Sequence, residues 1–262
     1  MKEERTQNNS NSIVTGDEIK NILNNYHIGK KPLAKLLGWG ETTIIRYIEG
    51  DTPTTEYSNK LREIANEPAY YYDLLLKNKD NLTNVAFRKS KNAVLGKLME
   101  SKISLVAQYI IHLIEGEVGA LYIQAILYYS QSFSLALYDK ELFPENYGVN
   151  TKNIPYIEIY NSMRKYGVNV LEMPKDRLTN EEMLLIKNVT DAISWYGPKG
   201  IRAAMAVERA NFRISRDKDN SRIISKEIIK KYFQEVLVQY DISNENDIYK
   251  YIDKKIIDIK HI

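Results

Sequence analysis

Residues 29–54 read GKKPLAKLLGWGETTIIRYIEGDTPT, and this stretch decides how the N-terminal part of the chain folds. Apolar residues recur at helical spacing in 31–37 and again in 41–48, which predicts two short helices. The turn between them begins at Gly38, where glycine can adopt a positive φ without a steric penalty. Gly50 provides a left-handed cap after the second helix. Two short helices joined by a glycine turn form a helix-turn-helix, whose second helix lies in the major groove of DNA.

The second of these helices has one face suited to the core and one suited to DNA. Ile44 and Tyr47 are three residues apart, so they share a face and can seat the helix on the core. On the other face, threonine can contact bases or phosphates, arginine can bind guanine, and isoleucine can touch a thymine methyl group. Two lysines begin the preceding helix, where phosphate contacts are usual. The predicted DNA-binding residues are Lys30, Lys31, Glu41, Thr42, Thr43, Ile45 and Arg46.

A small helical bundle with no role in DNA binding would show the same periodicity, because short patterns of this kind often arise by chance. The stretch nevertheless resembles the Cro/repressor-type helix-turn-helix over about residues 15–66, especially the version found in zinc-ribbon antitoxins. In that version a GWG turn precedes a helix ending in RY-x-x-G. The matching positions are Ala34, Gly38, Ile44, Arg46, Gly50 and Pro53. This resemblance implies operator binding, although the chain has no cysteines for a zinc ribbon, and Ile45 and Ile48 depart from the usual residues.

Composition narrows the class of protein further. The 262 residues are enough for two ordinary domains, and 44% of them are hydrophobic, so a substantial core is expected. There are no cysteines and three histidines, which argues against disulfides, thiolate zinc sites and a cysteine nucleophile. The net charge of +3 permits nucleic-acid binding without arguing for it. We find no membrane span and no secretory signal, and therefore expect a cytoplasmic protein with no metal or cofactor.

Apolar residues recur three and four positions apart along nearly the whole chain, which predicts a mainly α fold. We expect a small helix-turn-helix domain followed by a larger helical domain. The predicted parts are a disordered tail at 1–12, the helix-turn-helix domain at 13–80, a basic helical connector at 81–102, the larger domain at 103–240 and a C-terminal helix at 241–262.

Five stretches of the larger domain carry a second resemblance. They read SLVAQYII, ALYIQAILYYSQSFSLALYDKELF, IPYIEIYNSMRKYG, LTNEEMLLIKNVTDAISWYG and ISKEIIKKYF. Together, over about residues 103–235, they resemble the Panacea domain, the SocA-type antitoxin domain that also occurs in phage-associated proteins. The apolar frame is kept, but much of the polar signature is not. Ala125 stands where the family usually has lysine, and AVERANF carries Ala206, Val207 and Phe212 at its polar and tryptophan positions.

The resemblance to the Panacea domain implies direct neutralisation of a cognate toxin by protein–protein contact. Such a surface commonly presents aromatic anchors, and the chain has 20 tyrosines. The same aromatic residues lie in a strongly apolar segment, so each is also a candidate for the core. The predicted toxin-binding residues are Tyr128, Tyr129, Phe133, Tyr138 and Tyr156.

We find no catalytic constellation in the sequence and expect no enzyme: there is no P-loop, nucleophile elbow or H-E-x-x-H motif. A basic cluster at Arg209, Arg213, Arg216 and Lys218 can hold an acidic partner or a phosphate, although a solvated basic face is the default. The expected function is that of an antitoxin that binds its toxin and represses its own promoter as a homodimer. The alternative is a transcriptional regulator of phage or mobile-element type, whose second domain senses a ligand or a protein.

Overall fold

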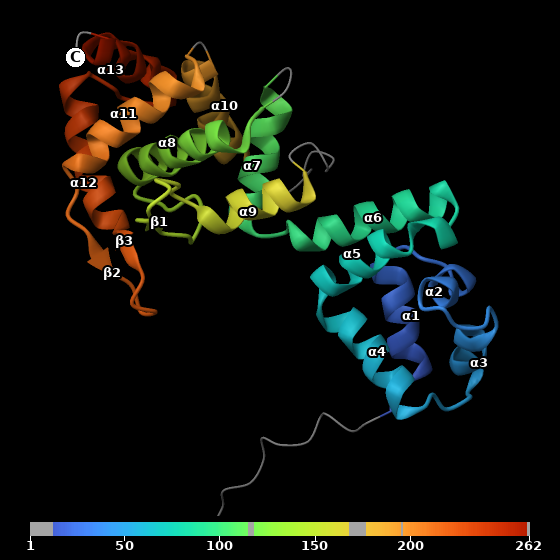
Figure 1. The fold of residues 1–262 in the computed structure, drawn as a ribbon. Helices are drawn as coiled ribbons and strands as arrows, with labels where there is room; N and C mark the ends of the chain where they lie inside the picture. Colours follow the sequence, from blue (N-terminus) through green and yellow to red (C-terminus); the bar gives the residue numbers. More distant parts are fainter. Residues whose placement is uncertain (1–12, 115–117, 168–176, 195, 261–262) are drawn as a thin grey trace, which may run out of the picture. The chain divides into compact units, whose positions relative to one another are not determined.

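A computed structural model describes residues 13–114, 118–167, 177–194 and 196–260 (Figure 1). These residues form thirteen α-helices and three short strands, so the predicted mainly α fold is confirmed. The chain divides into two compact units, residues 1–99 and residues 100–262. The predicted tail at 1–12 lies outside the described residues.

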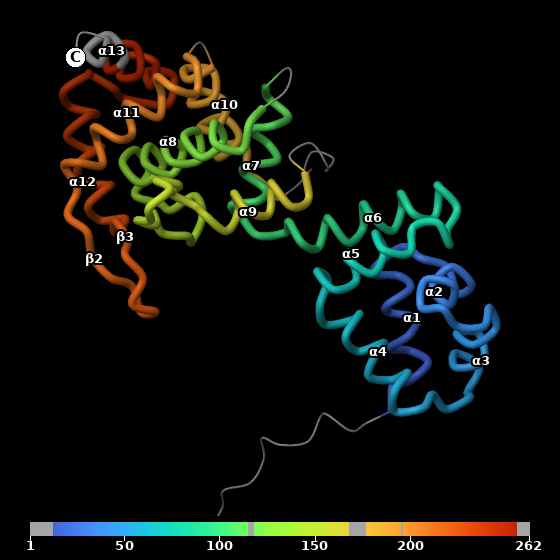
Figure 2. Tube along the Cα trace, in the orientation of Figure 1, coloured from blue at the N-terminus to red at the C-terminus, as the bar shows by residue number. Residues whose placement is uncertain are grey.

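The first unit is wholly helical in its described part, and Figure 2 follows its path from blue to blue-green. Its first helix begins as the sequence predicts: the hydroxyl of Thr15 accepts a hydrogen bond from the backbone of Glu18, whose carboxylate accepts one from the backbone of Thr15. The elements are α1 (Gly16–Asn25), α2 (Lys30–Leu36), α3 (Thr43–Glu49), α4 (Thr55–Asn66), α5 (Pro68–Lys77), the 3₁₀ turn η1 (Lys79–Asn81) and α6 (Asn84–Leu98).

Two buried tyrosines join the helices of the first unit. The rings of Tyr26 and Tyr71 stack with centroids 3.9 Å apart. The Tyr26 hydroxyl donates a 2.7 Å hydrogen bond to the carbonyl of Ile64, and the Tyr71 hydroxyl lies 2.5 Å from the hydroxyl of Ser90. Burial raises the pKa of Tyr26 to about 12. These bonds connect the end of α1 with α4, and α5 with α6.

The stretch 81–102 is helical as expected, but it is not a separate connector. Its helix α6 packs against α5 and places Val94 and Leu95 in the core at 0% exposure. The basic side chains of the stretch led to its prediction as a helical connector, whereas the apolar face of α6 belongs to the first unit. The division between the units falls after Met99.

The second unit contains the remaining helices and a small sheet (Figure 1). Its strands pair antiparallel in the order β1-β3-β2, with Tyr147 opposite Ile224. The elements are α7 (Lys102–Leu113), α8 (Ala120–Tyr138), β1 (Tyr147–Gly148), α9 (Ile157–Tyr166), α10 (Asn180–Ser194), α11 (Pro198–Ala210), β2 (Ser215–Arg216), β3 (Arg222–Ile224), α12 (Lys226–Gln239), the 3₁₀ turn η2 (Glu245–Asp247) and α13 (Tyr249–Lys260).

Helix α8 is the centre of this unit. Every residue from Tyr122 to Ala136 is buried, because α7, α9, α10, α11 and α12 all pack against it. Gln131 shows how a buried polar side chain of this helix is hydrogen-bonded. Its side chain accepts from the backbone of Leu142 at 2.8 Å and donates to the carbonyl of Phe143 at 2.9 Å. Because the helix is enclosed on all sides, its apolar residues occur on every face rather than on one stripe.

The predicted C-terminal helix is part of the second unit. Helix α13 packs against α10 and α11, and it buries Tyr251 and Ile252 at 1% exposure each. These apolar side chains are therefore part of the core of the second unit.

Candidate functional site

Helices α2 and α3 are the two short helices that the sequence predicts on either side of a glycine turn, and glycines with a positive φ lie in that turn and after α3. Gly38 has φ +72° in the turn, and Gly50 has φ +122° after α3. The backbone amide of Trp39 donates a 2.8 Å hydrogen bond to the carbonyl of Ala34, which holds the turn against α2. Helix α3 begins later than predicted, at Thr43, because a turn bond from Thr43 to the carbonyl of Gly40 precedes it. Glu41 therefore lies in the turn and not on the helix.

Helix α3 is seated by the face that the sequence indicates. Ile44 is completely buried, and the half-buried ring of Tyr47 meets Tyr57 of α4 edge-on, with centroids 6.3 Å apart. Trp39 stacks on the same Tyr57 ring at 4.0 Å. One tyrosine of α4 thus supports both the turn and α3, and it fixes which face of α3 remains outside.

The predicted DNA-binding residues lie on or beside this helix pair with accessible side chains. Thr43 and Ile45 are half-buried, and the other five, Lys30, Lys31, Glu41, Thr42 and Arg46, are exposed. The structure adds Lys35, which lies one helical turn after Lys31 on α2 and is also exposed. The four-residue spacing of these two lysines is the sequence signal that could have identified Lys35.

Acidic side chains partly neutralise the positive charge of this surface. The Glu41 carboxylate lies 2.9 Å from the Lys35 ammonium and 3.6 Å from that of Lys31. The hydrogen bond from Lys35 holds the pKa of Glu41 below its usual value. Arg46 donates from Nε to Asp51 at 2.7 Å. All of these side chains are solvent-exposed, so each ion pair contributes little to the stability of the fold.

Most of the predicted toxin-binding aromatic residues are core residues, which corrects that prediction. Tyr128 and Tyr129 are 1% and 0% exposed, Phe133 is 0% exposed and Tyr156 is 5% exposed. Helix α8 is surrounded, so its aromatic side chains pack inward and offer no surface to a partner in this structure. Tyr138 differs: it is half-buried and its hydroxyl donates a 2.8 Å hydrogen bond to Glu245.

A buried carboxylate that no sequence pattern indicated lies among these tyrosines. Glu208 of α11 is 0% exposed. Its Oε2 accepts from the Tyr128 hydroxyl at 2.8 Å, and its Oε1 accepts from Tyr129 at 2.9 Å and Tyr251 at 2.6 Å. Burial raises the pKa of Glu208, while the bonds from Tyr251, Tyr128 and Tyr129 oppose that shift. The group joins α8, α11 and α13, and its full enclosure suits structural support rather than contact with a ligand.

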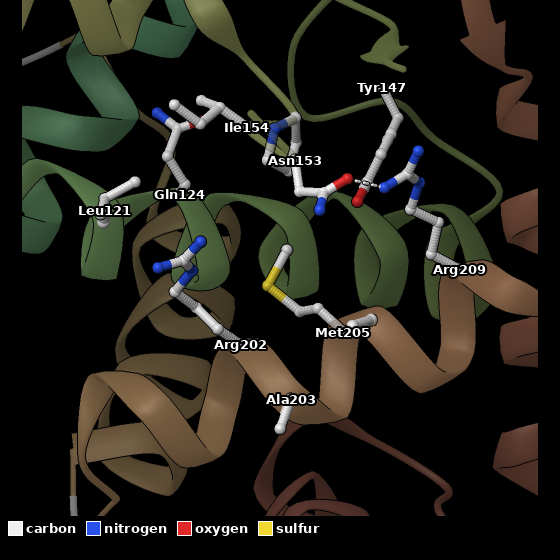
Figure 3. Close-up of a pocket in the computed structure, with 11 residues that line it drawn as sticks. Leu121, Gln124, Tyr147, Asn153, Ile154, Arg202, Ala203, Met205 and Arg209 are labelled. Atoms are coloured by element: carbon white, nitrogen blue, oxygen red, sulfur yellow. Dashed lines mark hydrogen bonds between the residues drawn. The ribbon is translucent and has the colours of Figure 1, made fainter. Parts of the chain in front are cut away.

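The second unit also contains a cleft of about 200 Å³ between α8, α11 and the loop that precedes α9 (Figure 3). Arg202 and Arg209 extend from α11 into it, with Met205 between them. The remaining lining residues are Leu121, Gln124, Tyr147, Asn153, Ile154, Pro155, Ala203 and Ala206. Of the basic cluster predicted at 209–218, only Arg209 reaches this cleft. Arg216 instead donates to the carbonyl of Asn220 at 2.8 Å.

Gln124 leaves a polar group unsatisfied at this cleft. The side chain is 2% exposed, and its Oε1 accepts from the backbone amide of Tyr156 at 2.9 Å. That bond fixes the amide orientation, so Nε2 is the free end, and it makes no hydrogen bond within the described part of the chain. A buried donor without a hydrogen-bond partner lowers the stability of the folded state by about 1–3 kcal/mol.

Among the described residues, no group of three or more His, Asp or Glu side chains is placed to hold a metal ion. No helix in the same residues is both long enough and apolar enough to cross a membrane. A scan against protein-family models, a search of curated proteins and a search of solved structures each gave no match for this chain.

Proposed function

We propose that the chain is a DNA-binding antitoxin, whose first unit binds operator DNA and whose second unit binds and neutralises a toxin. The observation that carries the DNA-binding half is the helix pair α2 and α3. Its glycines adopt the required backbone angles, its inner face is fixed on Tyr57, and its outer face exposes Lys30, Lys31 and Arg46. Arginine and lysine on such a surface provide the phosphate and guanine contacts that operator binding needs.

The toxin-binding half is supported by the sequence resemblance of residues 103–235. Since most of the aromatic residues first considered are buried, contact would rest on side chains that reach the surface. Tyr138 is one of them. Among the residues of the second unit that the structure describes, the exposed large apolar side chains are Leu184, Val207, Ile214, Val238 and Tyr249.

A transcriptional regulator with a ligand-binding second unit is the second candidate. The cleft at Arg202 and Arg209 favours it, because two arginines and a glutamine with a buried, unpaired amide donor line that cleft. Its volume of about 200 Å³ is below the ~300–1,000 Å³ typical of sites for drug-sized ligands, so only a small ligand would fit.

Co-expression with the product of the adjacent reading frame tests the first candidate. We expect the neighbour alone to arrest growth and the full chain to restore it. A Lys30→Ala, Lys31→Ala, Arg46→Ala triple variant should still restore growth, because neutralisation is assigned to the second unit. If no neighbour is toxic, the antitoxin proposal is wrong and the regulator remains.

Binding of the protein to the DNA upstream of its own gene tests the DNA-binding half of the proposal. We expect Arg46→Ala to weaken binding by ~1–3 kcal/mol at fixed salt, as loss of a bidentate base contact would. Unchanged affinity would remove Arg46 from the base-reading residues. Light scattering at micromolar concentration tests the expected homodimer, and a strict monomer would contradict it.

A further inference from the structure

The cleft between α8 and α11 has an unbalanced positive charge. Two of its 11 lining residues are arginines, and none is acidic. Arg209 donates to the side chain of Asn153, while Arg202 is exposed and pairs with no residue that the structure describes. Guanidinium groups donate hydrogen bonds and cannot accept them, so Arg202 and Arg209 can each bind acceptor groups of a ligand.

The buried Gln124 amide is a second, independent indication of a missing acceptor. Its Nε2 is a donor without a partner among the described residues, although the rest of the side chain is fixed by Tyr156. Buried donors without partners are rare in native proteins. Gln124 and Arg202 lie in one half of the cleft, and Tyr147, Asn153 and Arg209 lie in the other (Figure 3). Donor groups therefore line both halves of the cleft.

The loop that closes the cleft is held in place before any ligand binds. Asn150 donates from its side chain to the carbonyl of Ile154 at 2.6 Å and accepts from the Ile154 amide at 3.2 Å. The amide of Gly148 donates to the carbonyl of Pro155 at 2.8 Å. The apolar side chains of Leu121, Ile154 and Met205 also line the cleft, with Met205 between the two arginines (Figure 3). A pre-set site with charged ends and apolar walls favours a ligand of the same mixed character.

We propose that this cleft binds a small organic oxyanion, a carboxylate or phosphate ester with a short apolar group. Arg202 pairs with the anionic group, and a small adjustment of the wall lets Gln124 Nε2 donate to it. The apolar group lies against Met205. Arg209, held by Asn153, adds positive potential from the other end. This site is separate from the DNA-binding surface and does not depend on whether the second unit binds a toxin.

Methyl NMR of the full chain tests this site directly, because Met205 lines it and is one of six methionines. The methionine methyl groups are labelled with ¹³C, and a Met205→Leu variant identifies the resonance. Benzoate and phenyl phosphate are the anionic probes, and benzamide is the neutral match in shape to benzoate. We expect a saturable shift of the Met205 signal with at least one anion and none with benzamide.

Arg202→Gln should raise the Kd of the responding anion about tenfold or more, since it removes a charge-assisted contact. Arg213→Gln is the matched control, because Arg213 is exposed, belongs to the same unit and does not line the cleft. It should leave the Kd within about twofold.

Three results would overturn the proposal. They are no saturable shift with either anion up to about 10 mM, equal responses to benzoate and benzamide, and equal weakening by Arg202→Gln and Arg213→Gln. The comparison of benzoate with benzamide uses the wild-type chain, so it stands even if a variant folds poorly. Failure here leaves operator binding and growth rescue unaffected, so the two proposals are tested separately.

Discussion

The Tyr251 hydroxyl donates a 2.6 Å hydrogen bond to the carboxylate of Glu208, a residue 43 positions earlier that is completely buried. Tyr128 and Tyr129 donate to the same carboxylate from α8. Burying a carboxylate is costly unless hydrogen bonds replace its hydration, and here three hydroxyl donors do so. The C-terminal helix is thereby fastened to the centre of the second unit.

We predict that Tyr251→Phe lowers the free energy of unfolding of the second unit by about 1.5–3 kcal/mol, the usual contribution of a hydrogen bond to a charged group. The ring is retained, so its edge-on contacts with Phe133 and Phe233 persist. Urea unfolding of the full chain measures the loss. Tyr249→Phe, at a 51% exposed position at the start of the same helix, should change stability by less than about 0.5 kcal/mol. Equal effects of the two changes would show that the buried bond is unimportant.

Glu208 also predicts a particular dependence of stability on pH. Burial raises the pKa of Glu208 above its ordinary value of 4.5, so between the unfolded and folded values the folded state binds the proton more tightly. The stability contributed by this group is therefore lost as pH rises through that window.

The difference in unfolding free energy, wild type minus Glu208→Gln, should fall as pH rises from about 5, with a slope of at most about 1.4 kcal/mol per pH unit. Acids with lowered pKa, such as Glu18 and Asp247, produce the opposite slope in both proteins and cancel in the difference. Urea melts across the pH range measure it. A difference that rises with pH would mean that the tyrosine donors outweigh burial.

The sequence predicted features that local patterns determine and missed those that depend on distant packing. The capping box at Thr15 and the positive φ angles of Gly38 and Gly50 each follow from a few neighbouring residues. Glu208 gave no local signal, because its tyrosine partners lie 80, 79 and 43 positions away. An apolar segment such as α8 indicates burial but not which aromatic side chains reach the surface. The cleft is equally non-local, since α8, α11 and the loop before α9 each contribute part of it.

Two glycine substitutions in the first unit should have opposite effects on stability. Gly38 has φ +72°, so alanine there is strained although its Cβ would meet nothing within 4 Å, and we expect a loss of about 1–2 kcal/mol. Gly96 lies inside α6 with open space around it, and alanine should stabilise the unit by about 0.5–1 kcal/mol. Urea unfolding followed by circular dichroism and tryptophan fluorescence measures both. A neutral Gly38→Ala would show that the turn tolerates another backbone conformation.

Removing the charge of Glu41 should strengthen DNA binding. Its carboxylate forms ion pairs with the ammonium groups of Lys35 at 2.9 Å and Lys31 at 3.6 Å. In Glu41→Gln both ammonium groups become available to phosphates. Every additional lysine–phosphate pair steepens the slope of log K against log salt by about 0.9. A titration of salt concentration with upstream DNA therefore measures how many lysines the substitution releases.

Glu49→Gln is the matched control for this experiment. Glu49 is an exposed acid at the end of α3 and forms no ion pair with a described residue. Glu49→Gln changes the net charge by the same amount as Glu41→Gln but releases no lysine. Its slope of log K against log salt should therefore match that of the wild type. Equal slopes for both variants would attribute the stronger binding to net charge alone. Weaker binding by Glu41→Gln would instead indicate that Glu41 itself accepts a hydrogen bond from a base, as a carboxylate can from cytosine, and that its pairing with the lysines positions it to do so.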